Sequence, residues 1–61
     1  MPTGAKLKKA HAMAESLAAE MKIFAMDTED PQTKQMYANL ANTMEFAAGQ
    51  IKSRLEQINT F

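Results

Sequence analysis

The chain has 61 residues, of which 46% are hydrophobic, and its seven basic residues balance seven acidic ones. It contains no Cys, which excludes disulfides, thiolate metal sites and a thiol nucleophile, and its single His leaves little scope for structural zinc. Zero net charge argues against a dedicated nucleic-acid binder, whose affinity depends on accumulated positive charge. A chain this short buries only about 60% of its unfolded surface, so a partner chain is the expected source of added stability.

The first predicted helix spans about residues 4–26. Its apolar residues follow an alternating three-four spacing, which is typical of one face of a helix and not of a strand. This predicted seam contains Leu7, Ala10, Ala14, Leu17, Met21 and Phe24, with Ala18 and Ala25 beside it.

A turn is predicted at about residues 27–30, because Pro31 disfavours a helical conformation at Asp30. Asp30 is expected to cap a second helix over about residues 31–59, with Pro31 as its first residue. The seam of this helix contains Tyr37, Leu40, Met44, Ala47, Ile51 and Ile58. Gly49 is expected to permit close packing, which we favour, or to bend the helix.

A short turn between two long helices predicts an all-α fold, an antiparallel two-helix hairpin formed by the whole chain as a single unit. Pairing the two seams about the turn places Leu17 near Leu40 and Ala14 near Met44. The second helix is expected to overhang the first and to expose Leu55, Ile58 and Phe61.

A hairpin buries one stripe of each helix, yet apolar residues remain outside the predicted seam. A second copy would cover them, so we predict a homo-oligomer, in its simplest form a dimeric four-helix bundle. The residues predicted for self-association or a partner interface are Met13, Met36, Phe46, Leu55, Ile58 and Phe61. The alternative is an adaptor that docks on another protein or membrane-protein complex through Phe46, Leu55, Ile58 and Phe61.

Candidate chemistry is sparse. His11 and Glu15 stand four residues apart on one helix face, where they suit an ion pair or, with Glu45 in a dimer, a metal site. The Glu-x-x-His pattern of di-iron bundles is absent, and the internal Met residues suit packing better than copper storage, so no metal or cofactor is predicted. No nucleophile has a neighbouring base, and we therefore predict no catalytic residues and no enzymatic activity.

Charge and hydropathy also bear on location and partners. No export signal and no apolar run of about 20 residues is present, which predicts a cytoplasmic protein without a membrane span. Basic residues gather at the open end of the hairpin and acidic ones near the turn, a pattern that suits head-to-tail stacking of copies or contact with an acidic partner. Without aromatic stacking residues beside the basic ones, nucleic acid is not an expected partner.

Four parts of the sequence carry a family resemblance: Gly4–Lys8, Phe24–Asp30, Lys34–Tyr37, and Ile51 with Arg54. Together they resemble short proteins of spore-forming bacteria catalogued as domain-of-unknown-function family 1657. The resemblance implies a small soluble two-helix protein, linked by gene neighbourhood to spore membrane proteins that move small molecules, and it supplies no site residues. The sequence thus predicts a non-enzymatic, self-associating structural or accessory protein.

Overall fold

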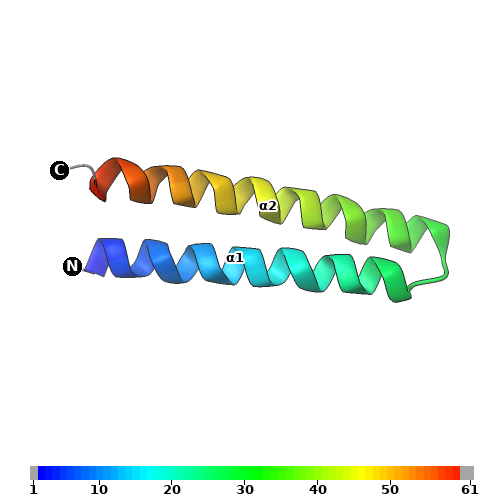
Figure 1. The fold of residues 1–61 in the computed structure, drawn as a ribbon. Coiled ribbons are helices and arrows are strands. Elements are labelled where there is room, and N and C mark those ends of the chain that lie inside the picture. The colour runs from blue at the N-terminus through cyan, green and yellow to red at the C-terminus, as the bar shows by residue number, and fades with distance from the viewer. Residues whose placement is uncertain (1, 60–61) are drawn as a thin grey trace.

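The structure, a computed structural model, describes residues 2–59 as two α-helices joined by a short turn (Figure 1). Helix α1 runs Pro2–Asp27 and helix α2 runs Pro31–Asn59. The helices lie side by side and antiparallel, so the start of α1 and the end of α2 lie together at the end opposite the turn, which we call the open end. The predicted all-α helical hairpin is confirmed.

Hydrogen bonds hold the helix ends at the turn. The Asp30 carboxylate accepts hydrogen bonds from the hydroxyl and the backbone N–H of Thr33, at 2.6 and 2.8 Å, and so caps α2. These bonds, that from the hydroxyl above all, lower the pKa of Asp30. At the end of α1, the Thr28 hydroxyl donates to the Phe24 carbonyl at 2.6 Å, and Lys34 Nζ donates to the Ala25 carbonyl at 2.8 Å. The turn thus satisfies backbone groups that the two helices leave open.

The seam between the helices is built from alanines. The buried residues in the described part of the chain are Ala14, Ala18, Ala41 and Ala48. Leu17, Phe24 and Leu40, which the sequence pattern assigned to the seam, are 44%, 40% and 41% exposed, so that part of the prediction is wrong. Alanines let the two backbones approach closely, and the larger side chains then project to the sides of the contact.

Three details of the helices also differ from the sequence prediction. Helix α1 begins at Pro2, about two residues earlier than expected, so α2 does not overhang it and Leu55 and Ile58 are half-buried. Phe61 lies outside the described residues. A Cβ atom added to Gly49 would meet no atom within 4 Å, so close packing does not explain this glycine. Helix α2 continues through Gly49 without a break.

The hairpin is a single layer of helices, with Cα dimensions of 48 × 14 × 11 Å. Its accessible surface is 4705 Å² for a mass of 6.8 kDa. A compact monomer of this mass is expected to expose about 4000 Å². Because the layer has nothing packed on it, its two broad sides are both open. Neither helix, over residues 2–59, has the length and apolar character needed to cross a membrane.

Candidate interaction surface

Two open grooves run between α1 and α2, and they share no lining residue. One, which we call the apolar groove, is lined by Lys9, Ala10, Ala12, Met13, Ala14, Ser16, Leu17, Glu20, Met44, Ala47 and Ile51. The other, which we call the polar groove, is lined by His11, Glu15, Ala18, Ala19, Lys22, Glu45, Ala48, Gly49 and Lys52. The hairpin therefore presents two chemically different sides.

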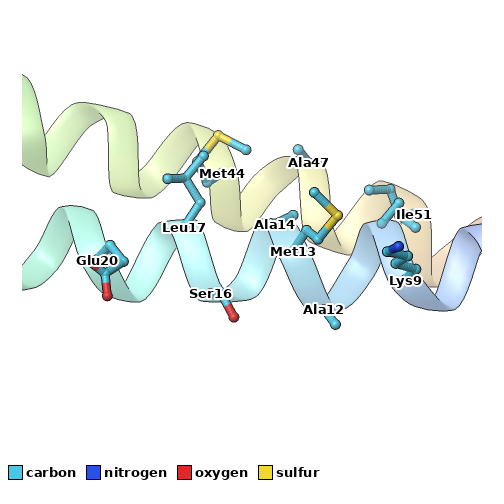
Figure 2. A pocket seen from close by; sticks show the side chains of 11 residues that line it. Lys9, Ala12, Met13, Ala14, Ser16, Leu17, Glu20, Met44, Ala47 and Ile51 are labelled. Carbon is cyan, nitrogen blue, oxygen red and sulfur yellow. The ribbon is translucent and has the colours of Figure 1, made fainter.

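The apolar groove is centred on long aliphatic and thioether side chains. In Figure 2, Leu17 of α1 reaches towards Met44 of α2, and Met13 extends below Ala47. Lys9 and Glu20 are the charged residues of this lining, Lys9 towards the open end and Glu20 towards the turn. The middle of the groove thus offers a surface without charge, flanked by one cation and one anion.

The same side of the hairpin stays apolar towards the turn. Phe24 follows Leu17 by seven residues, or about two helical turns, and Leu40 precedes Met44 by four, so each continues the side on which its neighbour lies. The rings of Phe24 and Tyr37 pack against each other with centroids 5.5 Å apart and planes tilted by 59°. We call this surface, the apolar groove with Phe24, Tyr37 and Leu40, the apolar face.

Four of the five charged or titratable residues of the polar groove are paired within the chain, and Lys52 is the fifth. Lys22 of α1 forms an ion pair with Glu45 of α2. His11 Nε2 lies 3.5 Å from Glu15 Oε2 one turn along α1. The structure brings His11, Glu15 and Glu45 to one groove, but within residues 2–59 no three acidic or His side chains are arranged to hold a metal ion. The groove is therefore a polar surface whose charged residues, apart from Lys52, are paired within the chain.

The residues predicted for an interface are distributed over different surfaces. Met13 lines the apolar groove, and Met36 lies about three turns before Ala47 on the same side of α2. Ile58 follows Ile51 by two turns and extends that side towards the open end. Leu55 follows the buried Ala48 by seven residues and belongs to the seam.

Phe46 does not belong to the apolar groove. Its side chain is 69% exposed and lines neither groove. Phe46 and Leu55 are nine residues apart, about two and a half helical turns, so they point to opposite sides of α2. Phe46 and Leu55, which the adaptor alternative placed on one docking surface, therefore lie on different surfaces, and Phe61 lies outside the described residues.

Five residues that the sequence pattern predicts for the seam between the helices line the apolar groove instead. They are Ala10, Leu17, Met44, Ala47 and Ile51. A signal for the true seam was present. Ala18 and Ala25 are seven residues apart, as are Ala41 and Ala48, which is the spacing of a coiled-coil contact made by small residues. Placing these alanines inside turns Leu17 and Met44 towards one side.

No curated protein and no solved structure matches the chain. The sequence profile of the family described as "Protein of unknown function (DUF1657)" matches residues 5–55. This range includes the turn, the alanine seam and the whole apolar groove. The chain therefore belongs to the DUF1657 family.

Proposed function

We propose that the protein is a non-enzymatic structural or accessory protein whose hairpins pair through their apolar faces into a four-helix bundle. The observation that carries this proposal is the composition of the core. The four buried residues of the described chain are alanines, whereas eight large apolar side chains are 40–75% exposed.

The energetics of burial favour a second layer. Fully burying a Leu, Met or Phe side chain contributes about 1.5–3 kcal/mol, much more than an alanine methyl group. Stable domains bury the apolar side of each element against another layer, and the single hairpin leaves Met13, Leu17 and Met44 without one. A second copy of the same chain supplies that layer, and no other protein is needed.

The exposed area also suits a dimer. The hairpin's 4705 Å² exceeds the expectation for a compact monomer by about 700 Å². A standard protein interface buries about 800 Å² of each partner. Pairing two apolar faces thus removes about the surplus surface that the elongated shape creates.

The proposed location rests on the family resemblance of the sequence, and the proposed lack of catalysis rests on its side chains. We place the protein in the cytoplasm of a spore-forming bacterium, in keeping with the family resemblance of the sequence. The chain has no Cys, and within residues 2–59 the one His contacts Glu15 and no hydroxyl group, so no nucleophile accompanies this pair, which supports a role in assembly and not in catalysis.

The proposal is tested by comparing Leu17→Glu with Phe46→Glu. Both substitutions add one negative charge near the middle of a helix, but Leu17 lines the apolar groove and Phe46 does not. We expect the wild type and Phe46→Glu to sediment as dimers and Leu17→Glu as a monomer, because a charge in a paired apolar face is costly.

The measurement is sedimentation velocity at equal concentrations, with helicity followed by circular dichroism. A wild type with the mass of one hairpin would contradict the proposal and favour the adaptor function. Dimers that Phe46→Glu disrupts and Leu17→Glu does not would move the interface to another side of the hairpin.

A further inference from the structure

The two ends of the hairpin carry opposite charge. Residues 2–13 and 47–59, which form the open half, hold five basic residues against one acidic residue, a net charge of +4. Residues 14–46, which form the half with the turn, hold two basic residues against six acidic ones, a net charge of −4. The chain as a whole is neutral, so copies do not repel each other through net charge, and the separation of charge acts on how they are oriented.

The charges beside the apolar groove follow the same division. Lys9 and Glu20 are eleven residues apart, about three helical turns, and therefore lie on the same side of α1. Among residues 2–59, neither of them makes an ion pair, whereas the polar groove pairs Lys22 with Glu45 and His11 with Glu15. The apolar face thus presents a cation and an anion at its edge that the chain itself does not neutralise.

Their positions are symmetric about the middle of α1. Lys9 lies seven residues after Pro2, the first residue of α1, and Glu20 lies seven residues before Asp27, the last. A second hairpin can pack on the apolar face through a twofold axis that runs across the helices, parallel to the layer. This rotation turns the hairpin end over end, so α1 lies antiparallel to α1 of the second copy. Lys9 of each copy then stands at the level of Glu20 of the other, on the same edge, and two ion pairs form per dimer.

The other twofold arrangement brings like charges together. A twofold axis parallel to the helices places α1 of one copy on α2 of the other, with both turns at the same end. Lys6 and Lys9 then lie beside Arg54 of the second copy, since Arg54 is also near the open end and follows Ala47 by two turns. The two halves of net charge +4 would also face each other.

We propose that the hairpins, in the pairing put forward above, dock end over end, with the open end of one copy against the turn end of the other and Lys9–Glu20 ion pairs at the edge. This inference rests on the proposed self-association and adds its orientation. Met13 and Leu17 stand on either side of the midpoint of α1, so those of both copies meet near the twofold axis, where interfaces concentrate their binding energy.

The orientation is tested by pulsed electron–electron spin distance measurement on Glu29→Cys. The chain has no other Cys, and Glu29 is exposed in the turn, so each hairpin carries one spin label at one end. Glu29 lies about 22 Å from the midpoint at 1.5 Å per residue, which predicts a label separation of about 44 Å end over end. With both turns together, helix spacing and label length give a separation below about 25 Å.

Charge reversal gives an independent readout. We expect Lys9→Glu to raise the dimer dissociation constant about tenfold, because two attractive edge contacts become repulsive, and the double variant Lys9→Glu with Glu20→Lys to restore it to within about twofold. Helicity measured at concentrations high enough for each variant to be dimeric shows that each variant folds. A short label distance, or tighter dimers of Lys9→Glu, would overturn the orientation while leaving the dimer itself in place. A monomeric wild type would instead overturn the proposed function, and the orientation with it.

Discussion

Single residues at the turn set where the helices end. Asp30 is held by two hydrogen bonds from Thr33, and its pKa is lowered from 3.8 by them. A carboxylate whose pKa is lower in the folded chain stabilises the fold while it is ionised. This contribution is fully present above the unfolded pKa and is lost as the pH falls through the folded value.

We therefore expect Asp30→Ala to lower the melting temperature at pH 7, because the N–H groups at the start of α2 lose their acceptor. Asp30→Asn keeps an acceptor without titrating. The melting temperature of the wild type should fall relative to that of Asp30→Asn as the pH falls below 3.8. If the melting temperatures of the two proteins change in parallel with pH, Asp30 does not act through its charge.

At Gly49 the expected effect has the opposite sign. Nothing lies within 4 Å of an added Cβ and the residue is helical, so Gly49→Ala should stabilise the chain by up to about 1 kcal/mol. Denaturant unfolding at fixed protein concentration measures this change. A loss of stability would reveal a close contact at Gly49 that forms between copies.

At the scale of the helices, the contact between α1 and α2 depends on small residues. Ala18→Leu or Ala41→Leu forces a larger side chain into a buried seam and should cost about 1–3 kcal/mol. Ala19 is exposed beside Ala18, so Ala19→Leu is the matched control and should be nearly neutral. Equal effects of Ala18→Leu and Ala19→Leu on the free energy of unfolding would place the seam elsewhere.

The sequence is sufficient to predict the two helices and the turn between them. It is not sufficient to predict which side of each helix contacts the other. Asp30 and Pro31 identify the turn because proline excludes a helical neighbour and aspartate caps, and both effects are local. Which side of each helix faces the other is a tertiary choice. Hydrophobicity predicts that Leu17 and Leu40 face inward, but the helices pack on Ala18 and Ala41, whose small size permits a closer approach.

The candidate surface follows from that same choice. Once the alanines face inward, Met13, Leu17 and Met44 gather on one side, and the spacing of apolar residues alone did not reveal it. The contact of His11 with Glu15 in the polar groove could be predicted from the sequence, because residues four apart on a helix are neighbours. The pairing of Lys22 with Glu45 depends on the rotation of both helices and was not predicted.

At the scale of the whole molecule, the hairpin is one layer of helices, and we propose that a second copy completes it. An alanine seam gives the single hairpin little buried apolar surface, so its folding and its association should be coupled. The two halves of opposite net charge then select among the ways in which two such layers can meet.

The most direct test of this account is the solution mass of the wild-type chain by light scattering across a dilution series, with helicity measured on the same samples. We predict a dimer that dissociates on dilution and loses helicity as it does so, because the apolar face is then exposed. A mass of one hairpin with full helicity at every concentration would contradict the account, since the alanine seam would then suffice by itself.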